Sequence, residues 1–255
     1  MALYSKPVRV LMKAMASALA TGPDAVFTKQ DAISWFAEKY PKIKVGTVTA
    51  HLTRLSTNAR SRTHYSAKPG EDDVLYQIDG SHYRHYRPGQ DPAPIYPGHA
   101  AAEPTKIPEG EDEEAITEPS AGGEFAYETD LRNYLAKNLN KLESGLRVYE
   151  EEGITGIEFP VGGRFIDILA TDAKGGLVVI ELKVSRGYDR VVGQLMRYVA
   201  WIKKNLAEPN QGVRGLIVAR EISEDLLLAC SMVRDVELFE YELSLSLKRV
   251  DETHV

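Results

Sequence analysis

The 255-residue chain has almost no cysteine and no long hydrophobic run. Its single cysteine, Cys230, excludes an internal disulfide and a cysteine-rich zinc site, which is typical of a protein in a reducing cytoplasm. The longest apolar runs fall far short of the ~20 residues that cross a membrane, so we expect no membrane partner. The six histidines show no metal-ligand spacing.

Charge is distributed unevenly along the chain. The net charge of −6 is unfavourable for a protein that binds an anionic polymer. Residues 1–99, however, carry 13 Lys and Arg against 8 Asp and Glu, whereas residues 100–127 carry 1 against 8. An acidic stretch therefore conceals a basic front half, and the charge of each domain decides whether it can contact nucleic acid.

Residues 1–90 are predicted to form three helices followed by a β-hairpin. Apolar residues recur at helical spacing over 6–20, and residues 28–31 provide a start of the capping-box type for a second helix. Gly46 opens a third helix, and Asp79-Gly80 is a strong two-residue hairpin signal. This order suggests a winged helix-turn-helix domain (α+β), whose third helix would enter the major groove of DNA.

The third helix and the hairpin carry side chains that commonly reach phosphates and base edges. The predicted DNA-binding residues of this half are Arg54, Thr57, Asn58, Arg60, Arg62, Arg84 and Arg87. The alternative is a winged-helix module for dimerisation or protein contact, in which the polar face of the third helix is merely solvated.

Residues 91–124 are rich in proline, glycine and acidic residues and lack periodicity. This composition predicts an extended, self-repelling linker. An alternative is a DNA mimic that occupies a basic groove when no substrate is present.

The most informative stretch, RFIDILATDAKGGLVVIELK, covers residues 164–183. Two apolar, β-branched runs flank a turn sequence with two glycines, which predicts an antiparallel hairpin. If the turn centres on the lysine in DAKGG, Asp167 lies directly opposite Glu181, and Lys183 lies on the same face.

Two carboxylates that face each other across an apolar hairpin repel, so something must compensate for their charge. A Mg²⁺ ion held by both would do so. A lysine beside them can orient or deprotonate a metal-bound water. Asp167, Glu181 and Lys183 therefore suit phosphodiester hydrolysis. The alternative is a structural salt bridge on a solvated sheet face.

This spacing resembles the D…ExK core of the PD-(D/E)XK nucleases. The longer run RFIDILATDAKGGLVVIELKVSRGYDRVVGQLMRYVAWIKKNL, with ETDLRNYLAKNL before it and VRGLIVAREISEDLLLA and VELFEYEL after it, resembles the NucS/EndoMS catalytic domain. The resemblance covers residues 125–250 and does not extend to the N-terminal half. It implies that residues 125–255 form an α/β restriction-endonuclease-like domain with a mixed central sheet flanked by helices.

The resemblance also implies residue roles. Asp167 and Glu181 would ligate the metal, the carbonyl of Leu182 would complete its shell, and Lys183 would position or activate the attacking water. Glu128 matches an acidic residue on the first helix of such nucleases that ligates a metal through water. Its alternative role is that of a helix-start acid favourable to the dipole.

The helix expected at residues 189–206 contributes further candidates. Gln194 matches the glutamine that follows the ExK strand in these nucleases, and its alternative is an ordinary solvated residue. Arg190 and Arg197 are predicted DNA contacts, beside Gln194 at helical spacing. Tyr198 and Trp201 either stack on bases or belong to the core.

We therefore expect a two-domain, Mg²⁺-dependent DNA endonuclease, with Mn²⁺ as a substitute, in which the winged helix chooses the site in double-stranded DNA. A homodimer is the economical way to cut both strands. A restriction-type role, directed by a sequence or a modified base, is the leading interpretation. The alternatives are a mismatch or repair endonuclease of NucS type and a non-catalytic DNA-binding regulator. We expect a cytoplasmic, nucleoid-associated protein.

Overall fold

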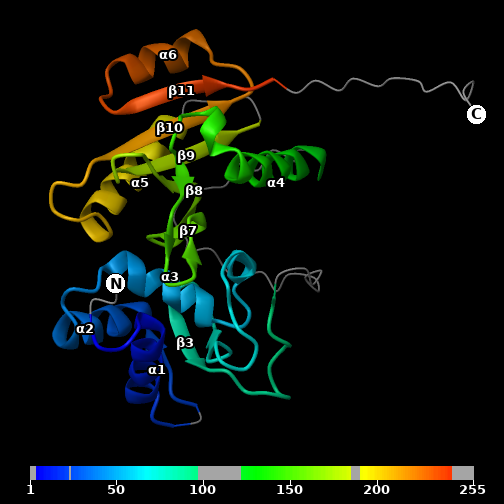
Figure 1. Cartoon of the computed structure of the whole chain (residues 1–255). Coiled ribbons are helices and arrows are strands. Elements are labelled where there is room, and N and C mark those ends of the chain that lie inside the picture. Colours follow the sequence, from blue (N-terminus) through cyan, green and yellow to red (C-terminus); the bar gives the residue numbers. More distant parts are fainter. Residues whose placement is uncertain (1–3, 23, 97–121, 185–189, 243–255) are drawn as a thin grey trace, which may run out of the picture.

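The computed structural model describes residues 4–22, 24–96, 122–184 and 190–242, which form two halves in contact (Figure 1). Most of the predicted linker, residues 97–121, lies outside these ranges. The N-terminal half contains helices and a small sheet, and the C-terminal half is a mixed sheet flanked by helices, as the sequence predicts. Within the described ranges, none of the helices has the length and apolar character needed to cross a bilayer.

The N-terminal half contains the predicted three helices and hairpin. Its elements are α1 (Val8–Leu19), β1 (Phe27–Thr28), α2 (Lys29–Lys39), α3 (Val45–Leu55), the 3₁₀ helix η1 (Arg60–His64), β2 (Leu75–Gln77) and β3 (His82–His85). The capping box forms as expected, because the Asp31 N–H donates to Thr28 Oγ1 and the Thr28 N–H donates to Asp31 Oδ2. β3 pairs with both β1 and β2, so a three-stranded antiparallel sheet closes the half.

The C-terminal half is built on a six-stranded mixed sheet. Its elements are α4 (Gly122–Lys137), η2 (Leu139–Lys141), β4 (Arg147–Val148), β5 (Glu150–Glu151), β6 (Ile154–Thr155), β7 (Ile157–Val161), β8 (Arg164–Thr171), β9 (Leu177–Lys183), α5 (Val191–Asn205), β10 (Val213–Ala219), α6 (Glu224–Ser231) and β11 (Val236–Glu240). The strand order is β11-β10-β9-β8-β4, with β7 also paired to β8. β9, β10 and β11 are parallel, and the other pairs are antiparallel.

The β8–β9 hairpin has the predicted register. Thr171 faces Leu177 and Ile168 faces Ile180, which places Asp167 and Glu181 next in line. The backbone ladder ends at the Ile168–Ile180 pair, and the N–H of Leu182 instead donates to the Asp167 carboxylate at 2.9 Å. The Asp167 carboxylate thus takes the place of a main-chain carbonyl as the hydrogen-bond acceptor, at the point where the candidate site begins.

Helices cover both faces of this sheet, because side chains alternate along a strand. Leu131 and Leu135 of α4 pack in one core with Ile168 and Ile180. Leu195 of α5 packs in the other core, against residues from the opposite face of the same strands. Figure 1 shows α4 and α5 on opposite sides of the sheet.

A short hairpin that the sequence analysis missed joins the two halves. β5 and β6 pair through Glu151 and Ile154, and both turn residues, Glu152 and Gly153, have positive φ (47° and 81°). This is the backbone of a type I′ turn. The carboxylate of Glu152 accepts the N–H of Val8 at 2.7 Å, so the C-terminal half caps α1, whose own N-cap residue makes no side-chain bond.

The joint between the halves is also apolar. α3 packs against β6, β7 and α5. Ala50 of α3 and Tyr65, which follows η1, are buried in the same core as α5. The N-terminal half therefore continues the hydrophobic core of the C-terminal half.

Candidate active site

The predicted carboxylates and lysine meet at the open end of the β8–β9 ladder. Glu181 is only 2% exposed. Its Oε1 accepts hydrogen bonds from Lys183 Nζ at 3.2 Å and from Gln194 Nε2 at 2.6 Å. Its Oε2 is buried without a hydrogen-bond partner among the described residues. Asp167 lies beside it and is held by the Leu182 N–H.

The site concentrates negative charge in a dry environment. Burial raises the pKa of Asp167, although the Leu182 N–H acts against that rise, and the charge of Glu128 adds to it. Burial and then the charge of Asp167 raise the pKa of Glu181. Burial alone would lower the pKa of Lys183, but the two carboxylates outweigh it and raise that pKa. Lys183 is therefore a cation, and it only partly offsets the acidic charge.

Gln194 contacts the candidate site. It lies on α5 and its amide nitrogen bridges the Glu181 carboxylate and the Tyr198 hydroxyl, at 2.6 Å and 3.2 Å. Tyr198 is buried in the α5 core, which favours the core role over base stacking. Trp201 is half-buried against the same core.

Glu128 lies on α4, close enough to influence the charge of both carboxylates. Among the described residues, however, no group of three or more His, Cys, Asp and Glu side chains forms a metal cage. The donor set nevertheless fits a hard divalent cation such as Mg²⁺, which takes one or two protein carboxylates and completes its shell with water and phosphate oxygens. The observation that fits such an ion is the buried Oε2 of Glu181, which has no hydrogen-bond partner in the described part of the chain.

The structure buries three of the predicted DNA contacts: Arg54 on α3, Thr57 just after it and Arg62 on η1. These residues are 3%, 1% and 0% exposed, which does not fit the predicted contact with DNA. Arg54 donates to the Glu152 carbonyl and to the Asp72 carboxylate, and Arg62 donates to the Arg54 carbonyl. The polar face of α3 is polar because it meets carboxylates and carbonyls of this chain.

The remaining predicted DNA contacts divide into two groups. Asn58 bonds with both its amide atoms to the main chain of Gln77, while Arg84 and Arg87 form ion pairs with Asp91 and Asp24. These three side chains have structural partners. The side chains that stay exposed are Arg60 at the start of η1, Arg190 at the start of α5, and Arg197 on α5.

The predicted linker begins too early. Residues 91–96 are fixed to the N-terminal half by two contacts. The Asp91 carboxylate accepts hydrogen bonds from both terminal nitrogens of the Arg84 guanidinium, and the Ile95 N–H donates to the Thr57 carbonyl. The first residues of α4, from Gly122, also fall within the predicted linker. Proline and acid content misled the prediction here, because Asp91 has an arginine partner that its local sequence does not show.

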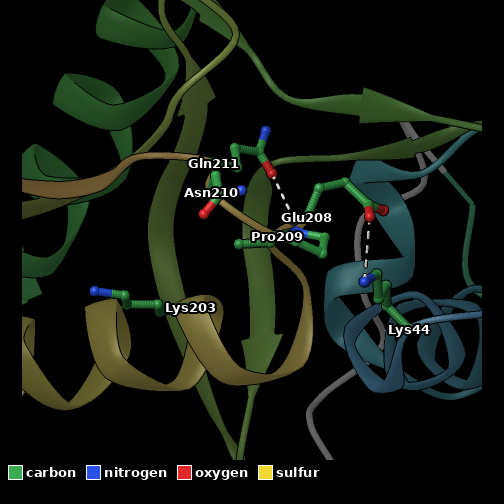
Figure 2. A pocket seen from close by; sticks show the side chains of 7 residues that line it. Lys44, Lys203, Glu208, Pro209, Asn210 and Gln211 are labelled. Atoms are coloured by element: carbon green, nitrogen blue, oxygen red, sulfur yellow. Dashed lines mark hydrogen bonds and ion pairs between the residues drawn. The ribbon is translucent and has the colours of Figure 1, made fainter.

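A pocket of about 510 Å³ lies between Lys44 of the N-terminal half and residues at and after the end of α5. Figure 2 shows the side chains that line it. Lys44 at the start of α3 forms a 3.3 Å ion pair there with Glu208, which follows α5. Lys203 of α5 also lines it. None of the predicted catalytic residues lines this pocket.

Two residues near the site were missed from the sequence. Arg132 is buried on α4, and its Nη1 lies 2.7 Å from Oε1 of Glu158 on β7. The spacing of Arg132, four residues after Glu128, would place both on one helix face and could have indicated it. No local signal singles out Glu158.

Comparisons with known proteins match the two halves to different families. Residues 127–248 match the family model described as Endonuclease NucS C-terminal domain, and residues 7–85 match a domain of unknown function, DUF7669. Endonuclease NucS 2 of Halobacterium salinarum is 38% identical over 101 residues, which are 40% of this chain and 36% of that protein. Endonuclease NucS of Sulfolobus acidocaldarius is 32% identical over 134 residues, which are 51% of this chain and 48% of that protein.

A crystal structure of a repair endonuclease from Pyrococcus abyssi is also similar, with 26% identity and a TM-score of 0.37 over 52% of this chain and 50% of that one. The chain spans less than half the length of the two curated relatives above. The C-terminal half is a NucS-like endonuclease domain, by its match to the NucS C-terminal domain and to the NucS relatives. It is joined to an N-terminal half that matches a different family.

Proposed function

We propose that this chain is a metal-dependent DNA endonuclease that hydrolyses phosphodiester bonds at Asp167, Glu181 and Lys183. The observation that carries the proposal is the buried Oε2 of Glu181, which no described residue hydrogen-bonds and which lies beside a second buried carboxylate and a lysine. A purely structural salt bridge would satisfy that oxygen. The names of the relatives, which are endonucleases, support the same activity.

Asp167 and Glu181 would hold the ion, with the Leu182 carbonyl as a further ligand, and Glu128 would act on it through water. A bound Mg²⁺ or Mn²⁺ would polarise the phosphate and lower the pKa of the attacking water. Lys183 is held beside Glu181 and can donate a hydrogen bond that orients this water. Gln194 fixes the Glu181 carboxylate from α5, so the metal-facing oxygen keeps one orientation.

The burial of α3 changes the proposal for DNA contact. We propose that the N-terminal half is a winged-helix module that docks on the nuclease half through α3, which favours the protein-contact alternative over groove reading. Double-stranded DNA would meet the exposed Arg190 and Arg197 beside the site, with Arg60 at its margin. A mismatch or repair role then fits at least as well as a restriction role, which needed α3 as its reader. A homodimer and association with the nucleoid remain parts of the proposal.

The test is cleavage of three duplexes by the full chain: supercoiled plasmid, a matched oligonucleotide and the same oligonucleotide with one mismatch. We expect cleavage with Mg²⁺ or Mn²⁺ and none with chelator. Asp167→Asn and Glu181→Gln should lower the rate by several kcal/mol of transition-state stabilisation. Glu143→Gln, which alters an acidic residue paired with Arg214, is the matched control. Cleavage by the Asp167 or Glu181 variants at more than a tenth of the wild-type rate would overturn the assignment.

A further inference from the structure

Glu158 has an unusual backbone for its position. It lies within β7, between the pairs Ile157–Ile168 and Phe159–Ile166, and therefore stands opposite Asp167 without joining the ladder. Its φ of 47° falls in the left-handed region that non-glycine residues rarely adopt. Such a conformation persists only where surrounding contacts hold it.

Those contacts come from the N-terminal half. Ser61 Oγ donates to Glu158 Oε2 at 2.6 Å, and His64 Nε2 lies 3.6 Å from the same oxygen. The Tyr65 hydroxyl donates to the main-chain carbonyl of Glu158 at 3.3 Å. Three residues at or beside η1 therefore hold both the side chain and the backbone of Glu158.

The other carboxylate oxygen points to the nuclease machinery. Glu158 Oε1 pairs with Arg132 Nη1 at 2.7 Å, and the Arg132 side chain is only 10% exposed. Arg132 lies one turn after Glu128 on α4, and its charge also acts on Asp167. A continuous polar chain therefore runs from η1 through Glu158 and Arg132 to the helix that carries Glu128.

We propose that Glu158 and Arg132 are positioning residues, which use the docked N-terminal half to set α4, and with it Glu128, against the carboxylate pair. The inference rests on the proposed nuclease function for its rate readout. It adds a role for the N-terminal half that requires no DNA contact by that half. Removing the link should leave DNA binding intact and reduce the turnover of bound DNA.

The experiment compares full-length wild type with Glu158→Gln, Arg132→Met, Arg132→Lys and Ser61→Ala. Glu143→Gln is the control, because Glu143 also pairs with a partly buried arginine in the same half. Two quantities are measured: hydrogen exchange of peptides covering residues 128–137 without metal, and kcat and KM for duplex DNA with Mn²⁺. Exchange probes the placement of α4 whether or not the protein cleaves DNA.

We expect Glu158→Gln and Arg132→Met to speed exchange in α4 and to lower kcat by about 10- to 100-fold with KM unchanged, because a small misplacement is costly in a catalytic site. Arg132→Lys should retain more activity than Arg132→Met. Ser61→Ala should also speed exchange in α4 and lower kcat, but by less than Glu158→Gln. The double variant Arg132→Met/Glu158→Gln should be no worse than the poorer single variant, because both remove one link.

The outcomes separate the two proposals. If wild type fails to cleave any DNA, the nuclease function is overturned, and α4 exchange still tests the link. Unchanged exchange in Glu158→Gln, or faster exchange with an unchanged kcat, overturns the positioning role. If Glu158→Gln does not fold, Ser61→Ala and Arg132→Lys decide in its place, and wild-type values for both would overturn the link.

Discussion

The guanidinium of Arg54 donates a hydrogen bond to the main-chain carbonyl of Glu152 at 2.6 Å. Arg54 lies on the helix that would read DNA in a winged-helix protein, and Glu152 is at the tip of the β5–β6 hairpin of the nuclease half. Glycine suits position 153 beside it, because φ there is 81° and a Cβ would lie 2.5 Å from Arg54 Nη1. The arginine best suited to base contact therefore closes the joint between the halves.

Arg54→Ala should behave as a stability variant. It leaves the fully buried Asp72 carboxylate without its ion-pair partner, which costs about 3–5 kcal/mol. Arg197→Ala, on the exposed side of α5, should instead weaken binding to all duplexes and make the log–log salt slope shallower by about one unit. Thermal unfolding and fluorescence anisotropy at several salt concentrations distinguish them. A shallower salt slope in a folded Arg54→Ala protein would restore α3 as a DNA contact.

Lys183→Ala should lose cleavage while keeping metal binding, because the lysine acts on water and on the Glu181 carboxylate rather than on the ion. We expect a loss of about 100-fold or more, within the range of positioned acid–base and hydrogen-bonding groups. Lys203→Ala, an exposed lysine on α5, is the control. Calorimetric titration with Mn²⁺ provides the second readout, and an equal loss of metal affinity would show that Lys183 is structural.

Gly46→Leu should separate the two halves. A Cβ on Gly46 would lie 2.9 Å from Leu206 Cδ1 and 3.3 Å from the Asn205 carbonyl, so α3 could no longer rest on the end of α5. Gly193→Leu is the matched control, because Gly193 is also helical and a Cβ there meets nothing within 4 Å. We expect a larger radius of gyration by X-ray scattering only for Gly46→Leu. An unchanged radius in both variants would mean that the joint tolerates the added side chain.

Glu158 should make stability depend on acid pH. Burial acts to raise its pKa, but His64, Arg132 and Ser61 outweigh it and lower that pKa to about 2. The folded state therefore favours the carboxylate, so Glu158 contributes its full stability above its unfolded pKa of about 4.5 and loses it as pH falls towards 2. Wild type should be more stable than Glu158→Gln at pH 6, and the difference should shrink between about pH 4.5 and pH 2. Urea unfolding of both proteins across this range measures it, and a constant difference would contradict the pKa.

The sequence predicts local structure here better than it predicts contacts between halves. The β8–β9 register followed from two apolar runs around a glycine turn, because turn position alone determines which residues face each other. It could not show that the ladder stops before Asp167, since a side-chain carboxylate competes for the Leu182 N–H. Gln194 was found through a family resemblance, whereas Glu158 depends on a backbone angle that no local residue pattern encodes.

The polar face of α3 also shows that a sequence pattern does not identify the partner of a surface. Arginine, threonine and asparagine on one helix face indicate a polar partner, and they do not distinguish phosphate oxygens from carboxylates and carbonyls of the same chain. In this protein Thr47 donates to Glu151 and Arg54 to Glu152. Only the β5–β6 hairpin reveals this partner, and its tip is signalled in the sequence by little more than Gly153.

The fit of α3 against the nuclease half restricts how this chain can diverge. Gly46 lies against Leu206 and the Asn205 carbonyl, and Gly153, at a φ of 81°, lies against Arg54, so a larger side chain at either glycine would strain the joint. These two glycines therefore constrain both halves, although the halves match separate families. Exchanging the N-terminal half for that of a distant homologue would fail unless the hairpin and the end of α5 were exchanged with it.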